Sequence, residues 1–265
     1  MSDTPETEEP ILLRDDRDGV ATLTMNRPAA RNALSAALMS ALEDAFKAIA
    51  KDAGVKVVIL AANGPAFCAG HDLKEMRANP GRHNYEALFT QCSRLMVAIT
   101  RLSRPVIAKV HATATAAGCQ LVATCDLAVT SDNARFATPG VNIGLFCSTP
   151  MVALSRAVGR KPAMEMLLTG TAIDATEALR LGLVNRVVVA DALDGATWDL
   201  AAAIAAKSPL TVATGKEAFY RQIELDLDAA YAYTSEVMTH NMMAHDAAEG
   251  IDAFLEKRHP KWEGR

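Results

Sequence analysis

Between residues 105 and 125 the chain passes from an apolar run through a stretch of very small residues into a second apolar run. The β-branched run from Pro105 to Val110 predicts a buried strand, and the run from Gly118 to Cys125 predicts a helix. Such a turn can point unpaired backbone N–H groups at an anion or at an activated carbonyl oxygen, aided by the partial positive charge of the helix N-terminus. Close packing of a helix on a sheet also needs small residues, so both interpretations stay open at this point.

A similar unit precedes this one. The nearly continuous apolar run from Val55 to Ala61 predicts a strand that is covered on both faces. The loop after it ends in Ala69-Gly-His-Asp72, and Asp72 is a suitable N-cap for a short helix over 73–78. Two amide donors that converge on one oxygen atom from these two turns would form an oxyanion hole. No dinucleotide-binding, P-loop or G-x-S-x-G motif occurs at any of these turns, which weakens the nucleotide-binding and serine-hydrolase interpretations.

The pattern elsewhere predicts an α/β core followed by helices. Asp18-Gly19 is a turn signal between two strands, Ser35 is a suitable N-cap for a helix to about residue 52, and a third strand pair over 126–138 ends at Pro139-Gly140. We therefore divide the chain into a flexible acidic N-terminus (1–10), a core (11–200) and a helical C-terminal region (201–265). The apolar helical pattern from 209 to 259 favours subunit packing or, equally, ordinary packing within one chain.

Composition argues against several classes of function. The chain has 265 residues and a net charge of −4, whereas nucleic-acid binding requires a basic face. No apolar run is long enough to span a bilayer, and the acidic N-terminus resembles neither a signal peptide nor a transit peptide, so we expect a cytoplasmic protein. No spacing of side chains indicates a metal site. The five cysteines are expected to be reduced and buried: Cys68, Cys92, Cys119, Cys125 and Cys147.

Several motifs occur in the order and spacing of a known family. They are Asn26-Arg-Pro with Asn32-Ala-Leu-Ser, Phe67-Cys-Ala-Gly-His-Asp-Leu-Lys, Ala116-Ala-Gly-Cys-Gln, Phe136-Ala-Thr-Pro-Gly and Gly250-Ile-Asp-Ala-Phe-Leu-Glu-Lys-Arg. On these residues the chain resembles the crotonase (enoyl-CoA hydratase/isomerase) superfamily and, within it, most closely the enoyl-CoA hydratase domain-containing protein 3 branch. The resemblance implies an α/β fold, the crotonase/ClpP-like spiral of ββα units, with a C-terminal helical trimerisation region. It also implies a homotrimer or a dimer of trimers.

The same resemblance assigns roles to individual residues. It implies an acyl-CoA thioester as ligand, with coenzyme A as part of the substrate and no tightly bound cofactor. The two oxyanion amides fall on His71 and Ala117. Residues at CoA-lining positions are Ala30, Arg31, Ala69, His71, Asp72, Leu73, Phe254 and Lys257, of which the last two match positions that reach CoA from a neighbouring subunit in some members.

Two positions depart from the family pattern. A family hydratase uses two Glu side chains near the β-carbon of its substrate, and the matching positions here are Gln120 and Gly140. Glutamine does not transfer a proton near neutral pH, glycine has no side chain, and each general acid or base contributes about 10²–10⁴-fold. We therefore expect an enzyme of fatty-acid or related acyl-CoA metabolism that hydrates simple 2-enoyl-CoA thioesters weakly. A gap at Gly140 would admit a small anion such as bicarbonate as an external base.

Other interpretations stay open. The chain can be a catalytically silent acyl-CoA binder that sequesters thioesters or regulates a partner, or its helical tail can serve an assembly role. The imidazole of His71 titrates in a useful range, but it can equally point away from the thioester. Cys119 lies beside the start of a helix, where a thiol pKa can fall, yet a buried packing role is the simpler interpretation.

Overall fold

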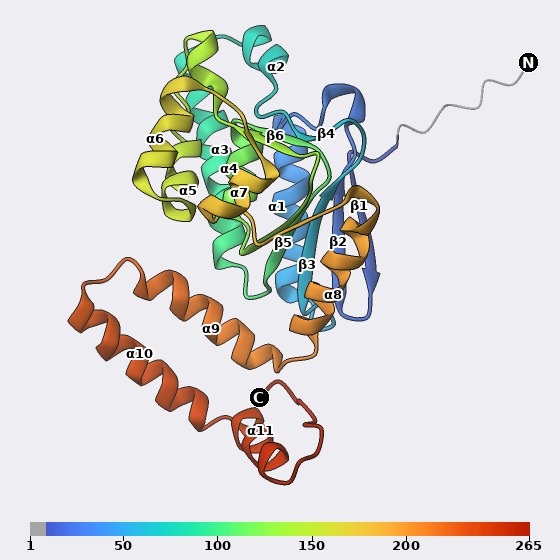
Figure 1. Ribbon diagram of the computed structural model, residues 1–265, viewed down its shortest axis with the longest axis vertical. Coiled ribbons are helices and arrows are strands. Elements are labelled where there is room, and N and C mark those ends of the chain that lie inside the picture. Colours follow the sequence, from blue (N-terminus) through green and yellow to red (C-terminus); the bar gives the residue numbers. More distant parts are fainter. Residues whose placement is uncertain (1–8) are drawn as a thin grey trace, which may run out of the picture.

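The larger of two sheets is built from strands that are far apart in the sequence. The computed structural model describes residues 9–265 (Figure 1). In spatial order the six strands of this sheet are β1 (Leu12–Arg17), β2 (Val20–Met25), β3 (Val57–Ala62), β5 (Val106–Val110), β7 (Leu127–Ser131) and β10 (Arg186–Val188). The first two pair antiparallel through the predicted turn at Asp18 and Gly19, and the remaining neighbours are all parallel.

The smaller sheet has four strands. They are β4 (Ala66–Cys68), β6 (Thr113–Thr115), β8 (Arg135–Ala137) and β9 (Ile173–Asp174), of which the first three are parallel. The pairs β3/β4, β5/β6 and β7/β8 each place one strand in each sheet. Each pair is followed by helical segments, so the expected spiral of ββα units is confirmed.

Helices cover the outside of the spiral and fill its centre. Those of the core are α1 (Ala36–Lys51), α2 (Leu73–Ala78), α3 (Arg82–Arg101), α4 (Ala117–Thr124), α5 (Pro150–Ala157), α6 (Arg160–Thr169), α7 (Ala175–Leu181) and α8 (Leu193–Ala205), with 3-10 turns η1 (Pro28–Ala30), η2 (Pro139–Ile143) and η3 (Ala190–Ala192). Ser35 caps α1, since its hydroxyl accepts from the Leu38 N–H at 3.2 Å, as the sequence predicts.

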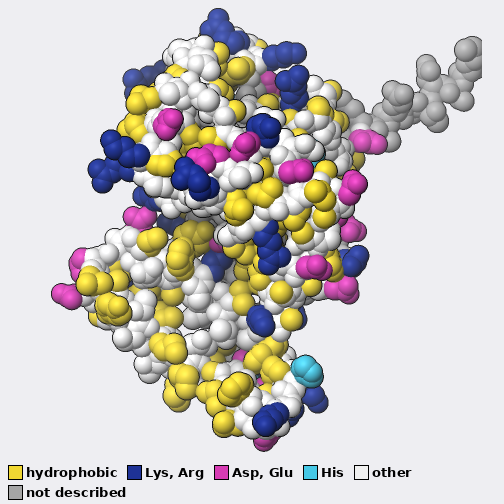
Figure 2. Space-filling model, in the orientation of Figure 1, with side chains coloured by type: hydrophobic (Ala, Val, Ile, Leu, Met, Phe, Trp, Pro, Cys, Tyr) yellow, Lys and Arg dark blue, Asp and Glu magenta, His cyan; other side chains and the backbone are white. Residues whose placement is uncertain are grey.

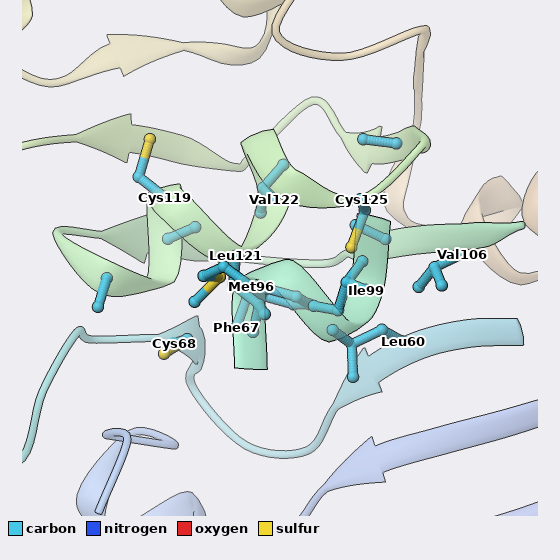
Figure 3. Close-up of a cluster of buried hydrophobic side chains, with 14 of the residues drawn as sticks. Leu60, Phe67, Cys68, Met96, Ile99, Val106, Cys119, Leu121, Val122 and Cys125 are labelled. Carbon is cyan, nitrogen blue, oxygen red and sulfur yellow. The ribbon is translucent and has the colours of Figure 1, made fainter. Parts of the chain in front are cut away.

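The core is divided by the larger sheet. Alternate residues of β3 point to opposite faces, so Val58 and Leu60 join the main cluster, whereas Val57 and Ile59 pack with α8 on the other face. Figure 3 shows Leu121 and Val122 of α4 among side chains from β3, β4, β5 and α3. All residues of α4 except Ala123 are buried, which requires the small residues seen in its sequence.

The C-terminal helices extend away from this core (Figure 1). They are α9 (Pro209–Gln222), α10 (Leu227–Met242) and α11 (His245–Leu255). We predicted the break between core and tail after residue 200, but that position lies inside α8, which packs on the larger sheet, so the break follows Ala205. The prediction for residues 1–10 falls almost wholly outside the described residues. Within 9–265, no helix combines the length and the apolar character needed to cross a bilayer.

Candidate active site

Three of the predicted site residues lie at one edge of the smaller sheet. His71 follows β4, Ala117 follows β6 and Gly140 follows β8. Because these three strands are parallel neighbours, their carboxyl ends lie side by side, which is where open α/β sheets bind ligands. The Ala116 N–H donates to the Ala137 carbonyl at 2.9 Å and so joins the second and third of these turns.

The turn after β4 is held by the segment before α1. The Ala69 N–H donates to the Arg31 carbonyl (3.0 Å), the Leu34 N–H to the Gly70 carbonyl (2.7 Å), and the Asp72 N–H to the Leu34 carbonyl (3.2 Å). These bonds use the Asp72 N–H after His71 and the Gly70 carbonyl before it. Within residues 9–265 the His71 N–H itself has no acceptor.

Asp72 fixes the helix that follows this turn. Its carboxylate accepts from the Lys74 and Glu75 N–H groups, both at 3.2 Å, so the predicted N-cap is confirmed. The same carboxylate pairs with Arg27 at 3.0 Å. Burial opposes ionisation of Asp72, but the hydrogen bonds from Arg27 and from the helix amides outweigh it and lower the pKa. The charged carboxylate therefore stays in place as a structural group.

The turn after β6 contains a strained residue. Ala116 has φ 50° and ψ −118°, although alanine rarely adopts a positive φ. This turn sets Ala117 as the first residue of α4, where a backbone N–H has no partner within the helix. Ala117 is 0% exposed, and no acceptor for its N–H occurs in the described part of the chain. A buried amide without a partner is rare, which marks this N–H for a ligand.

Glycines allow the two turns to touch. A Cβ atom at Gly70 would lie 2.9 Å from the Ala116 Cβ and 3.4 Å from the Ala117 nitrogen. A Cβ atom at Gly118 would lie 2.1 Å from the Cys68 carbonyl oxygen. Only glycine permits either approach, so the unpaired amides of His71 and Ala117 belong to two turns in direct contact.

The two positions that carry Glu in family hydratases have different surroundings in this structure. The Gln120 side chain is buried, and its Oε1 accepts from the Cys92 thiol at 3.9 Å. A Cβ atom at Gly140 would lie 2.2 Å from the Leu145 carbonyl oxygen and 2.9 Å from the Cys147 Sγ. The loop after η2 therefore folds back against Gly140 and occupies the direction in which a side chain would point. The use of a small anion as an external base stays a prediction.

The His71 side chain packs against α3. Its ring meets the Phe89 ring edge to face, with 5.5 Å between centroids, and its buried Nε2 has no hydrogen-bond partner. Burial lowers the pKa of this imidazole to about 4. The ring is thus neutral at physiological pH.

Comparison with known proteins shows to which family the chain belongs. A model described as Enoyl-CoA hydratase/isomerase matches residues 15–265. The chain belongs to the enoyl-CoA hydratase/isomerase family. It is similar to the crystal structure of an enoyl-CoA hydratase from Mycobacterium smegmatis, with a TM-score of 0.94 and 59% identity over 96% of this chain and 99% of that one.

Two further relatives carry the same branch name, so the resemblance seen in the motifs is confirmed. The crystal structure of human enoyl Coenzyme A hydratase domain-containing protein 3 has a TM-score of 0.93 and 47% identity, covering 96% of this chain and 100% of that one. The rat mitochondrial enoyl-CoA hydratase domain-containing protein 3 is 46% identical over 258 residues, which are 97% of this chain and 86% of the relative. That relative is named as mitochondrial, and a cytoplasmic location for this family member stays a prediction.

The remaining CoA-lining positions divide into two groups. Ala30, Arg31, Ala69 and Leu73 lie beside the first turn, with Arg31 in the left-handed region at φ 51° and Leu73 50% exposed. Phe254 and Lys257 lie at α11, at the opposite end of the long axis from α2 (Figure 1). One copy of this family member therefore does not bring all eight predicted residues together.

Three residues that support the site were not singled out from the sequence. Arg27 pairs with Asp72, and Asn32 binds the Asn63 and Ala66 carbonyls with its amide nitrogen at 2.7 and 2.8 Å. Both belong to motifs that we quoted for the family, but only the folded contacts show what they do. Thr138, in the Phe-Ala-Thr-Pro-Gly motif, is buried with an unpaired hydroxyl.

Proposed function

We propose that this chain binds an acyl-CoA thioester with its carbonyl oxygen between the His71 and Ala117 N–H groups, and that it stabilises the enolate of that thioester. The observation that carries the proposal is the pair of unpaired amides on two touching turns. Each donor of this kind is typically worth about 3–4 kcal/mol in a transition state. Membership of the enoyl-CoA hydratase/isomerase family supports a thioester as the ligand.

Hydration of simple enoyl-CoA thioesters by this site is expected to be weak. The Gln120 amide cannot cycle a proton, and backbone rather than a carboxylate occupies the space beside Gly140. His71 does not replace the missing groups, because its lowered pKa of about 4 leaves too little imidazolium for acid catalysis and makes a weak base. The site favours reactions in which the enolate needs little proton transfer from the protein.

A catalytically silent acyl-CoA binder is the second candidate. The absence of both family carboxylates from the two matching positions favours it, since the binding amides do not depend on them. In this role the protein sequesters thioesters or regulates a partner. Turnover separates the two candidates, whereas thioester binding is common to both.

A trimer, or a dimer of trimers, is the proposed assembly. The α10 helix has no buried residue, and Met243, Phe254 and Leu255 are 82%, 82% and 71% exposed. Figure 2 shows hydrophobic side chains gathered on these C-terminal helices. In this proposed assembly a neighbouring copy covers these side chains and contributes its own Phe254 and Lys257 to the CoA site.

The test is a panel of acyl-CoA and enoyl-CoA thioesters. Products are followed by mass, and binding is measured by calorimetry with free CoA as the reference ligand. We expect thioesters to bind more tightly than CoA itself and crotonyl-CoA to be hydrated slowly or not at all. Hydration at ordinary family rates would contradict the weak-hydration claim, and equal binding of CoA and its thioesters would contradict the thioester site.

A further inference from the structure

The C-terminal helices are not held in place by a hydrophobic core of their own. In the described part of the chain, no member of the two hydrophobic clusters lies beyond Ala205, and α10 has no buried residue. The buried residues of α11 are Asp246 and Ala253. Most helices in proteins owe their stability to the packing of an apolar face, which is small here. The position of Phe254 and Lys257 therefore depends on the polar contacts of α11.

The carboxylate of Asp246 binds the segment that follows α11. It accepts hydrogen bonds from the Glu263 N–H at 2.8 Å, the Gly264 N–H at 3.0 Å and the Ser208 hydroxyl at 2.5 Å. The Asp246 N–H in turn donates to the Arg265 carbonyl at 3.0 Å. Burial opposes ionisation of Asp246, but the hydrogen bonds from Ser208 and the two amides outweigh it and lower the pKa. The charged carboxylate thus ties residues 263–265 to the start of α9.

The Trp262 side chain binds the joint between α8 and α9. Its Nε1 donates to the Ala206 carbonyl at 2.9 Å, and a Cβ atom at Gly250 of α11 would lie 3.0 Å from its ring. After α11 the chain returns to the start of α9 (Figure 1), where a Cβ atom at Gly264 would lie 3.4 Å from the Pro209 side chain. Residues 261–265, which we call the C-terminal clip, therefore link α11 to the end of α8, which packs on the larger sheet.

The end of α11 is fixed by further contacts with the C-terminal clip. Arg258 donates to Glu256 at 2.6 Å and to both carboxylate oxygens of Glu249 at 2.7 and 2.8 Å. Glu249 also accepts from the Lys261 N–H at 2.7 Å. Lys257 lies between Glu256 and Arg258 with φ 56°, a left-handed conformation that residues other than glycine keep only where surrounding contacts impose it. These contacts therefore decide where Lys257 lies.

We propose that the C-terminal clip positions Phe254 and Lys257 for the binding of CoA, and that Asp246 and Trp262 are positioning residues. The inference rests on the proposed CoA site, to which a neighbouring copy contributes Phe254 and Lys257, and adds the part of the chain that places them. Asp246 and Trp262 bind the joint after α8, far along the chain from the two oxyanion turns. Their effect therefore falls on the CoA part of the ligand and not on its thioester carbonyl.

The affinity for free CoA, measured by calorimetry on the full chain, tests this positioning role. Asp246→Ala removes the acceptor of the clip amides, and we expect a loss of affinity of about tenfold or more, the size of one charge-assisted hydrogen bond. Butanoyl-CoA should lose the same factor, so the ratio of the two affinities stays unchanged. The control is Asp252→Ala, at an exposed position of the same helix, which should leave both affinities unchanged.

Trp262→Phe is a milder variant that disturbs the fold less. The phenyl ring keeps the contact with Gly250 but lacks the Nε1 donor, so we expect a severalfold loss of CoA affinity. Trp198→Phe is the matched control, because Trp198 lies in α8 and its ring packs against Arg17, with 3.8 Å between the guanidinium carbon and the ring centroid. This control should leave the CoA affinity unchanged.

A double-mutant cycle separates positioning from a merely structural effect. With Phe254→Ala and Lys257→Ala already present, the C-terminal clip has nothing left to position, so adding Asp246→Ala should weaken CoA binding by less than about twofold. Hydrogen exchange in Asp246→Ala should become faster in α11 and at Gly264 but stay unchanged in α8. Sedimentation at one protein concentration should give the same assembled mass for this variant and the natural chain.

Three results would overturn the inference. The first is a CoA affinity that survives both Asp246→Ala and Trp262→Phe. The second is a loss that adds in full to the loss from Phe254→Ala and Lys257→Ala, and the third is a loss that appears only when the assembled mass also changes. A natural chain that binds CoA and butanoyl-CoA equally would instead refute the thioester site and leave the clip in place, whereas a natural chain that binds neither ligand would refute both.

Discussion

A Cβ atom at Gly70 would come within 2.9 Å of the Cβ atom of Ala116. Gly70 has φ 94° and no side chain, so the two turns that carry the unpaired amides can lie against each other there. A side chain at Gly70 would also meet the Thr115 carbonyl oxygen and the Ala117 nitrogen, so it would force the two turns apart.

Gly70→Ala should weaken thioester binding. The added methyl meets Ala116 and the Thr115 carbonyl oxygen, so the two turns must separate, and the left-handed φ adds strain. We expect at least a tenfold loss of acyl-CoA affinity and a loss of stability of about 1–3 kcal/mol. Gly19→Ala is the control, since Gly19 has φ 78° but no contact below 3.5 Å, and it should lower stability without changing affinity. Unchanged affinity in Gly70→Ala would count against a rigid pair of donors.

Gly140→Ala should destabilise the protein. The methyl would lie 2.2 Å from the Leu145 carbonyl oxygen, so the loop must move, at about 1–3 kcal/mol or more. Gly195→Ala in α8, where nothing lies within 4 Å, should instead stabilise by about 0.5–1 kcal/mol. Urea unfolding measures both. For the same reason, Gln120→Glu combined with Gly140→Glu should fail to produce a hydratase, and a stable, active double variant would refute this view of the loop.

Stability should fall between pH 6.5 and about 4 in part because of His71. The unfolded chain takes up a proton on this imidazole below its ordinary pKa of 6.5, whereas burial keeps the folded form neutral to about pH 4. Proton uptake thus favours the unfolded state as pH falls, by roughly 2 kcal/mol across this window. His71→Phe should lose this part of the pH dependence of unfolding. Parallel curves for the variant and the natural chain would show that the ring is not held neutral.

Lys216→Met should loosen α9 from the core. The buried Lys216 ammonium donates to Asp126 at 2.6 Å and to the Ile99 and Arg104 carbonyls at 2.9 and 3.0 Å. Removing it leaves the half-buried carboxylate of Asp126 without a counter-charge, which costs up to about 3–5 kcal/mol. Lys47→Met breaks an exposed pair with Asp44 and should change the unfolding free energy by less than about 1 kcal/mol. A similar small effect at both positions would mean that Lys216 does not anchor α9.

Much of the fold was predictable from local pattern. The turn at Asp18, the caps at Ser35 and Asp72, and the order of strand, small-residue turn and helix depend on neighbouring residues only. All five cysteines are buried, as expected, and burial raises the pKa of Cys119 to about 12, in agreement with a packing role. We placed the end of the core before the end of α8. The Ala-rich sequence of this helix has the same pattern whether the helix covers a sheet or packs on another helix.

The sequence predicted only those parts of the site whose geometry depends on the backbone. The small residues around Gly70 and Ala117 predict two closely packed turns. The loop through Leu145 and Cys147, by contrast, folds back against Gly140 along a path that the sequence pattern does not show. The unpaired Thr138 hydroxyl is equally invisible in sequence, because pairing depends on which carbonyl lies nearby after folding.

The vibrational frequency of a bound thioester carbonyl tests the central claim most directly. An acyl-CoA labelled with ¹³C at the thioester carbon allows that stretch to be isolated by infrared difference spectroscopy. We predict a shift to lower frequency on binding, which is reduced in Ala117→Pro, because proline at the first position of α4 removes the N–H without breaking a helical hydrogen bond. Ala175→Pro, at the first position of α7, should leave the shift intact. A bound carbonyl that keeps its solution frequency, or a shift that Ala117→Pro does not reduce, would contradict the account.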